Sequence, residues 1–197
     1  MKKAVCCLLP LLLLTGCRAM PFGRELESTM VVQVLGVDWT QGQVTLTAVS
    51  APTEEEGELL LSAQGEDLDG AKAALKGAGE NYVDLTHVTQ LVVGEGADLY
   101  ALLEAPLLEP ETGQSATVWL VREGTAQQLL TQAQGVARRL SSIELNCGLS
   151  PVTVLQGLME LEEDGTCQVP ILYVENGVLT PGETRQVSAG EEDGGGA

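Results

Sequence analysis

The sequence predicts a single α/β domain of the mixed α+β kind, in which helices pack on one mixed sheet of about five to seven strands. Apolar runs of strand length alternate with segments of helical periodicity between residues 29 and 180. The first two strand segments are separated by a short turn, which requires antiparallel pairing. The later strands are joined through helices, which favours parallel crossovers, so we expect both kinds of pair in one sheet.

The N-terminal half of this domain predicts three strands followed by a helix. The run TMVVQVLGVDW (29–39) is apolar on both faces, as in a fully buried strand, and QVTLTAVS (43–50) alternates between apolar and polar residues. A third strand is expected at 59–65. The segment 66–79 has apolar residues at helical spacing, acidic residues near its start and glycines at its end, which together predict a helix.

The C-terminal half predicts strands and helices in alternation. Its expected elements are a strand at 87–95, a helix from 96 that is broken by Pro106 and Pro110, a strand at 115–124, a helix at 125–145 with a break at Gly135, a helix at 151–165, and one or two strands at 167–179 around an Asn176-Gly177 turn. The tail 181–197 is acidic and rich in glycine, so we expect it to be disordered.

Seven apolar side chains are expected to share one core because they lie inside the predicted strands. They are Val34, Leu46, Leu60, Leu91, Val92, Val118 and Leu120.

The N-terminus predicts export and lipid attachment. Residues 1–16 carry Lys2 and Lys3 before a leucine-rich stretch that is too short to span about 30 Å of hydrocarbon. The ending LTGC resembles the lipobox of bacterial lipoproteins, in which the cysteine takes a diacylglycerol thioether and the chain is cut before it. Cys17 would then be the first residue of the mature chain and its membrane anchor, and residues 17–28 would be a tether. The alternative is an ordinary signal peptide with a chance cysteine at the cut.

Charge and composition exclude some ligands. The chain carries 28 acidic and 10 basic residues, a formal net charge of −18. Such a surface repels nucleic acid and anionic lipid headgroups, so neither is expected as a ligand. Aromatic residues make up only 3% of the chain, which argues against a groove that stacks sugars or bases.

Two cysteines remain beyond the signal and the anchor. Cys147 and Cys167 are separated by 19 residues, and an exported protein could join them in a disulfide. Two unpaired, partly buried thiols are the alternative, and the sequence does not decide between them. With His87 as the only histidine, these cysteines do not form a zinc-binding pattern, and we expect no metal site.

The sequence predicts no enzyme and no cofactor. His87 has no cysteine nearby in sequence, and no serine lies in a Gly-x-Ser-x-Gly turn. The segment GEGADL (94–99) lacks the third glycine of a nucleotide-binding loop. The acidic runs at 54–56 and 160–164 are typical of solvated surface. Asp38 follows an apolar strand, where it is either a turn residue or, less expected, a buried base.

Five segments behind the lipobox form an ordered set: RELE (24–27), VLGVD (34–38), SAQGEDLDGA (62–71), LTHVTQLVVGE (85–95) and VWLVREGTAQQLL (118–130). In order and spacing they resemble the N-terminal domain of the Ger(x)C lipoproteins (GerAC type), the C subunits of spore germinant receptors. That family has an Arg-Glu pair after the lipidated cysteine, a strand ending in Gly-x-Asp, and a Gly then Ala that open a helix. A Ser/Thr-His before a strand ending in Gly-Glu follows, and then a strand with Gly-x-Ala behind it.

The resemblance marks eight residues as fold or partner-binding positions: Arg24, Glu25, Gly36, Asp38, Gly65, His87, Gly94 and Glu95. The first two either help to dock the tether or form a solvated charge pair. Gly36 and Asp38 are expected to shape a turn, and His87 to be a hydrogen-bonded structural residue. The Gly94-Glu95 pair is expected at a strand-to-helix junction, where a helix N-terminus favours the negative charge.

The resemblance also implies a function. It implies a lipid-anchored, non-catalytic, C-subunit-like component of a germinant receptor, which acts in spore germination through contacts with integral membrane subunits. Its location would be the extracytoplasmic face of the spore inner membrane or of the cell membrane. The alternative is a stand-alone envelope lipoprotein that binds a small molecule or assists envelope assembly.

Overall fold

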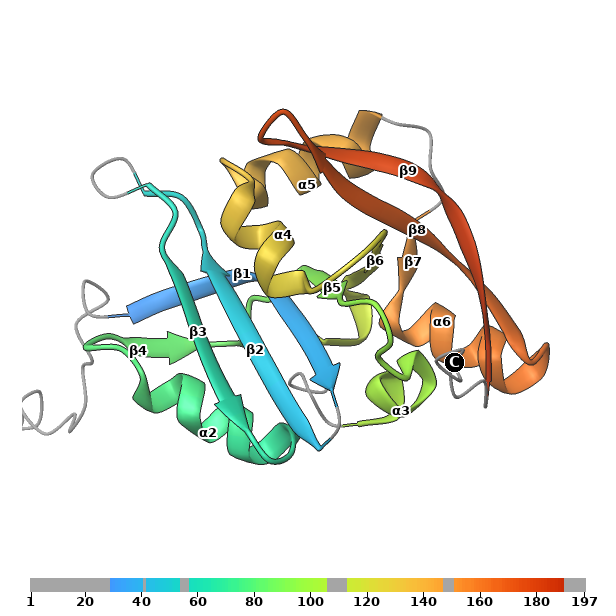
Figure 1. Ribbon diagram of the computed structural model, residues 1–197, viewed down its shortest axis with the longest axis horizontal. Helices are drawn as coiled ribbons and strands as arrows, with labels where there is room; N and C mark the ends of the chain where they lie inside the picture. Colours follow the sequence, from blue (N-terminus) through green and yellow to red (C-terminus); the bar gives the residue numbers. More distant parts are fainter. Residues whose placement is uncertain (1–28, 41, 54–56, 106–112, 147–150, 190–197) are drawn as a thin grey trace, which may run out of the picture.

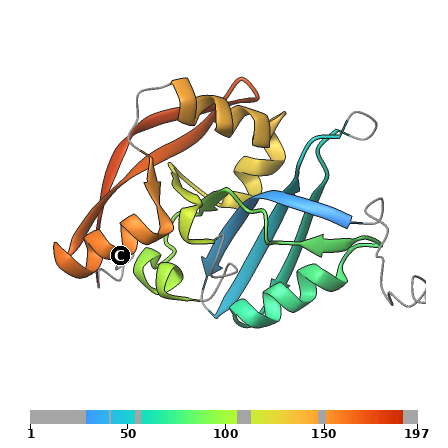
Figure 2. The same ribbon diagram turned by 180° about the vertical axis from the view of Figure 1, so that it is seen from behind.

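The computed structural model describes residues 29–40, 42–53, 57–105, 113–146 and 151–189. In this part of the chain nine strands form one mixed sheet, and helices cover both of its faces (Figures 1 and 2). The strands are β1 (Thr29–Thr40), β2 (Gln43–Ser50), β3 (Leu60–Gly65), β4 (Tyr82–Asp84), β5 (Gln90–Val93), β6 (Thr117–Val121), β7 (Val152–Thr153), β8 (Thr166–Glu175) and β9 (Val178–Ser188). The helices are α2 (Leu68–Gly77), α3 (Leu99–Glu104), α4 (Ala126–Gln132), α5 (Val136–Asn146) and α6 (Val154–Glu163), with a 3-10 turn at Gly113–Ser115.

The strand order along the sheet is β3-β2-β1-β5-β6-β8-β9, with β4 beside β1 and β7 beside β6. The four central strands β1, β5, β6 and β8 run parallel, and helices join most of them. Antiparallel strands form both borders, β2 and β3 on one side and β9 on the other. The mixed sheet that the sequence predicts is confirmed, and it has more strands than expected.

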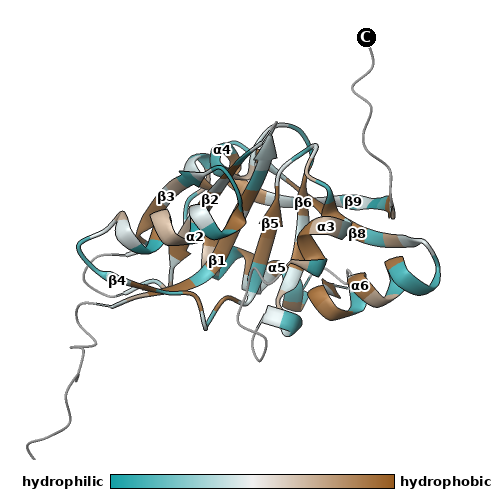
Figure 3. Ribbon diagram, turned by 90° about the horizontal axis from the view of Figure 1, so that it is seen from below, coloured by the Kyte–Doolittle hydropathy of each residue, from teal (hydrophilic) through white to brown (hydrophobic). Residues whose placement is uncertain are grey.

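Two hydrophobic cores lie on opposite faces of the sheet. The helices α2, α3 and α6 pack on one face and α4 and α5 on the other (Figure 1). The central strands contribute side chains to both cores, and Figure 3 shows that their residues are mostly hydrophobic. An irregularity between Val32 and Val34 shifts the register of β1, so Val32 faces the same core as Leu35 although the two are an odd number of residues apart.

Several predicted elements are confirmed in place. The hairpin of β1 and β2 lies where the sequence predicts it. The helix expected at 125–145 is two helices that meet at Gly135, which has a φ of +60°. Asn176 and Gly177 form the two-residue turn between β8 and β9, both with positive φ. The short strands β4 and β7 were not expected.

The predicted disorder of the tail is wrong for its first part. Residues up to Ser188 continue β9, which pairs with β8 from Val178 opposite Glu175 to Ser188 opposite Thr166. The composition of this segment favours disorder, but the ten-residue edge of β8 supplies backbone partners along its whole length. Pro181 lies next to a register shift on this border strand, where a proline is tolerated.

One of the seven predicted core residues is misplaced. Leu60 is 42% exposed, whereas Val34, Leu46, Leu91, Val92, Val118 and Leu120 are all buried. Leu60 begins β3, which pairs only with β2 among the described strands. Its position at the border of the sheet, which no local sequence pattern reveals, leaves it partly in water.

We expect Val92→Ala to lower the free energy of unfolding by about 1–3 kcal/mol, because Val92 is fully buried in the core under α4 and α5. Leu60→Ala is the control and should cost less than about 1 kcal/mol, although it removes more atoms. Urea unfolding of both variants measures the difference. Equal costs would contradict the assignment of Val92 to the core.

Candidate functional site

Three of the five segments that carry the family resemblance meet at one place, where β1 and β5 end and α4 begins. We call this place the β1–β5–α4 junction. Asp38 from β1 is 6% exposed, and its carboxylate accepts hydrogen bonds from the backbone N–H groups of Ala126 at 2.6 Å and Gln127 at 3.0 Å. Thr125 accepts from the N–H of Gln128 at 3.1 Å. Three of the four N–H groups that α4 leaves without an intrahelical partner, those of Ala126, Gln127 and Gln128, therefore have a side-chain acceptor.

Two glycines make room for this junction. A Cβ on Gly94 would overlap Oδ1 of Asp38, so this position has space for the carboxylate only if it lacks a side chain. A Cβ on Gly36 would lie 2.6 Å from Cδ1 of Leu130 and 3.3 Å from Cβ of Ala126. Gly36 therefore lets α4 approach β1 closely.

Glu95 ties the loop after β5 to the loop before α4. Its backbone N–H donates to the carbonyl of Gly124 at 2.9 Å, and its carboxylate accepts from the N–H of Gly124 at 2.8 Å. The sequence predicts that Gly94 and Glu95 lie at a strand-to-helix junction. In the structure they lie beside the start of α4, which is not the next helix in the sequence. α3, the next helix in sequence, is capped by Asp98.

Burial dominates the electrostatics of Asp38. It raises the pKa of the carboxyl above its ordinary value of 3.8, against the backbone hydrogen bonds from Gln127 and Ala126, which lower it. Both carboxylate oxygens are bonded to backbone groups of α4. The arrangement therefore caps a helix, which the sequence did not predict, and Asp38 lies within β1 and not in the turn that follows it.

Gly65 performs a similar packing role at α2. A Cβ there would overlap the backbone nitrogen of Ala71, so the strand end and the first turn of the helix are in backbone contact. Asp67 caps the same helix by accepting from the N–H of Gly70 at 2.7 Å. The segment SAQGEDLDGA is thus a tight strand-to-helix turn.

His87 lies away from the β1–β5–α4 junction. Its side chain is 65% exposed, and Nδ1 lies 2.9 Å from Oγ1 of Thr86 and 3.5 Å from Oδ2 of Asp84. Burial raises the pKa of Asp84, but the hydrogen bonds from Thr86 and the charge of His87 outweigh it, so the net pKa lies below 3.8. These contacts order the turn between β4 and β5.

Four predicted site residues lie outside the described part of the chain: Cys17, Arg24, Glu25 and Cys147. Cys167 is buried with a free thiol. Burial, together with the hydrogen bond and charge of Glu160, raises its pKa to about 12, which makes it unreactive as a nucleophile at neutral pH. Its pairing with Cys147 stays a prediction.

Sequence reasoning missed the polar contacts that hold α5. Glu58 accepts from the N–H groups of Val136 at 2.6 Å and Ala137 at 3.0 Å, so it caps the start of the helix. Nearer the other end, Glu144 accepts from Gln90 at 2.8 Å and from Thr117 at 2.8 Å. The only signal in the sequence was a glutamine inside an apolar strand, and it does not identify its partner.

The buried amide of Gln90 continues this network into the core. Its Oε1 accepts from the indole N–H of Trp119 at 2.6 Å, and both residues are almost fully buried. In the hydrogen-bond network that links Trp119, Gln90 and Glu144, each side chain therefore has a partner, as buried polar groups require.

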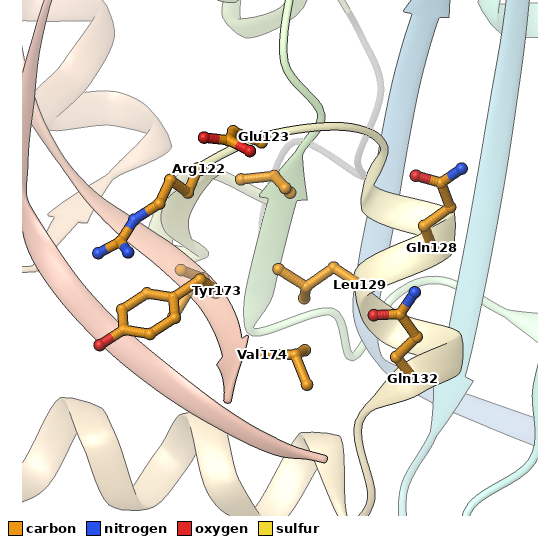
Figure 4. Close-up of a pocket in the computed structure, with 9 residues that line it drawn as sticks. Arg122, Glu123, Gln128, Leu129, Gln132, Tyr173 and Val174 are labelled. Carbon is orange, nitrogen blue, oxygen red and sulfur yellow. The ribbon is translucent and has the colours of Figure 1, made fainter. Parts of the chain in front are cut away.

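An open pocket of about 380 Å³ lies between the end of β6, β8 and α4. The guanidinium of Arg122 stacks on the ring of Tyr173 at 3.7 Å on one side, and Gln128 and Gln132 lie on the other (Figure 4). Leu129 points into the space between them. Glu123 also lines the pocket, so the site combines a cation, a carboxylate and two amides, which can bind a small polar group.

The described residues hold no group of three or more His, Cys, Asp or Glu side chains placed to bind a metal ion. Among the helices of the described ranges, none is long and apolar enough to cross a membrane.

We expect Gly94→Ala to destabilise the fold strongly, because the added methyl group displaces the Asp38 carboxylate from the start of α4. Gly77→Ala is the matched control, since it ends α2 with open space around it, and it should be neutral or slightly stabilising. Thermal unfolding followed by circular dichroism compares the two. A Gly94→Ala variant as stable as wild type would rule out the tight packing of the junction.

The raised pKa of Asp38 predicts a pH-dependent cost for Asp38→Asn. A folded-state pKa above 3.8 adds stability to the wild type that is complete below pH 3.8 and is lost as the pH rises through the folded value. The asparagine variant lacks this dependence. Its free energy of unfolding should therefore lie further below that of the wild type at pH 3 than at pH 7. Urea unfolding at both pH values measures the gap. A gap that widens toward pH 7 would mean that the two hydrogen bonds outweigh burial.

Comparison with known proteins adds no relative to this description. No protein-family model, no curated protein sequence and no solved structure matches the chain.

Proposed function

We propose that this protein is a lipid-anchored, non-catalytic component of a spore germinant receptor, similar to its C subunit, and that it acts through protein–protein contacts at the membrane. The observation that carries the proposal is the convergence of three resembling segments on the β1–β5–α4 junction. The anchor in this proposal is the lipid on Cys17, and the partners are integral membrane subunits of the receptor.

The convergence supports the resemblance because it gives the matching residues a common physical reason. Asp38 binds the N–H of Ala126, Gly94 leaves space for the Asp38 carboxylate, and Glu95 is bonded to Gly124. Residues that contact one another in this way must change together if the packing is to be kept. Three segments in the same order and spacing, joined in this way, fit a shared fold better than coincidence.

The chemistry of the marked residues supports a contact function. The carboxylate of Asp38 is occupied by the helix that it caps, and His87 is an exposed residue beside Thr86 and Asp84. Gly36, Gly65 and Gly94 act through the space that they leave. These residues shape the fold, so we place the function in its surface and its anchor.

Deletion of the gene, followed by an assay of spore germination, tests the proposal. We expect a weaker germinant response or lower levels of partner subunits, with full rescue by the wild type and by His87→Gln. Cys17→Ala should not rescue, because the precursor would stay unprocessed or mislocalised. A His87 variant that abolishes the response while its fold and membrane level are normal would instead point to proton transfer or ligand binding.

A second candidate function is the binding of a small molecule by an envelope lipoprotein, and the pocket of Figure 4 favours it. Its Arg122, Gln128 and Gln132 could hold a polar group. Genome context separates the candidates. Neighbouring genes for a multi-pass transporter-like subunit and a larger membrane subunit favour the receptor, and an isolated gene in a non-sporulating organism favours the second candidate.

A further inference from the structure

We infer that the free edge of β3 is a strand-addition site for an extended, uncharged segment of another protein that has basic residues at both ends. The inference rests on the proposed contact function and names the surface and the chemistry of the partner. β3 is the outermost strand of its side of the sheet, and among the described strands it pairs only with β2 (Figure 1).

The backbone of β3 offers a row of groups to such a strand. The N–H of Ser50 donates to the carbonyl of Leu59 at 2.9 Å, which makes Ser50 and Leu59 a hydrogen-bonded pair. Because such pairs alternate along an antiparallel ladder, Leu61 and Ala63 direct their N–H and C=O groups toward β2. The N–H and C=O groups of Leu60, Ser62 and Gln64 are therefore directed to the open edge.

The two borders of the sheet differ in how they discourage pairing. β9, the opposite border, carries Pro181, Glu183 and Arg185, and a proline or charges on an edge strand hinder the addition of another strand. β3 reads LLSAQG and has neither a proline nor a charge. Its pairing with β2 has no register shift, whereas the pairing of β9 with β8 has one. The edge of β3 is thus the one of the two that can accept a strand.

A groove beside β3 can receive side chains of the added strand. It has a volume of about 570 Å³ and lies between the α4–α5 bend and the start of β3, of which only Leu60 lines it. Leu130 and Val136 form its apolar part, and Glu58 and Arg138 line it as well. An added strand would point every second side chain toward this face of the sheet. Backbone bonds would then supply affinity, and the groove would select apolar side chains, as in other cases of strand addition.

Charge identifies the partner. Glu58, whose carboxylate also caps α5, lies two residues before β3, and Glu66 and Asp67 follow the strand. A second copy of this chain added antiparallel about Ser62 would bring Glu58 of one copy opposite Glu66 of the other, and each copy carries a net charge of −18. Like charges directly opposite are unfavourable, so we commit to a different protein with Lys or Arg at both ends of the added segment.

The test uses a synthetic peptide, acetyl-Lys-Val-Thr-Val-Thr-Val-Lys-amide, and the full lipidated chain in detergent. Fluorescence anisotropy of the labelled peptide measures binding. We expect saturable binding of this peptide and at least about tenfold weaker binding of the same peptide with Glu in place of both Lys residues. Lack of saturation by the Lys-flanked peptide at about 1 mM would overturn the inference.

Two variants at one position separate the backbone from the side chain. Gln64→Pro removes an N–H that is directed to the open edge, so we expect at least about tenfold weaker binding. Gln64→Ala keeps this N–H and is the matched control, with an affinity within about twofold of wild type. Equal affinities of folded Gln64→Pro and Gln64→Ala would overturn the inference.

Hydrogen–deuterium exchange of the wild type keeps the inference falsifiable if Gln64→Pro does not fold. The Lys-flanked peptide should slow exchange in residues 59–65. Slowing confined to β9 or to α6, or dimerisation of the chain through β3 without the peptide, would overturn it. The outcome is independent of germination: peptide binding can fail while the deletion phenotype stands, and the phenotype can be absent while the peptide binds.

Discussion

The carboxylate of Asp38 joins two parts of the chain that are almost ninety residues apart, and the other features of the β1–β5–α4 junction depend on it. The carboxylate lies at the positive end of α4 and accepts from two N–H groups of its first turn, and these bonds partly offset the cost of its burial. Gly94 has no side chain because the carboxylate occupies that space. The contact also fixes where α4 crosses β1, which places Leu130 in the core with Val34.

Carboxylates hold the whole α4–α5 layer in the same manner. Asp38 caps α4, Glu58 caps α5, and Glu144 anchors the end of α5 to Gln90 and Thr117 in the sheet. In a chain with 28 acidic residues, three of them thus have a structural task that composition alone would not suggest. A basic side chain also holds this layer, because Nε of Arg139 donates to the carbonyl of Leu179 at 2.9 Å.

The sequence was informative wherever the decisive interaction is local. The Asn176-Gly177 turn and the helix break at Gly135 could be predicted because the residues themselves select the backbone conformation. The cap by Asp38, the exposure of Leu60 and the extension of β9 to Ser188 could not. Each of these depends on which distant strand or helix lies alongside, and a single sequence carries no record of that neighbour.

Within the candidate site, too, only the local features could be predicted from the sequence. The segments behind the family resemblance were visible in the sequence as short motifs, but their meeting at the β1–β5–α4 junction required the fold. The sequence predicts a hydrogen-bonded His87 from its place before a strand, and its Nδ1 lies 2.9 Å from Oγ1 of Thr86. Its structural role stays a prediction. The Trp119–Gln90–Glu144 network could not be predicted from the sequence, because one glutamine among apolar residues has many candidate partners.

The strand order of the sheet has a consequence for how the chain folds. Both borders are built from neighbouring segments, β1 with β2 and β3 on one side and β8 with β9 on the other, so they need only short loops to close. The centre requires β1 to meet β5, with the segments of β2, β3, α2 and β4 between them, and non-local pairing of this kind slows folding because loop closure costs entropy before contacts form. The seven-residue helix α4 is too short to be stable alone, and beyond its local Thr125 cap it gains the Asp38 bonds only when β1 lies beside it. This topology predicts that the local hairpins form before the α4 layer and its Asp38 contact.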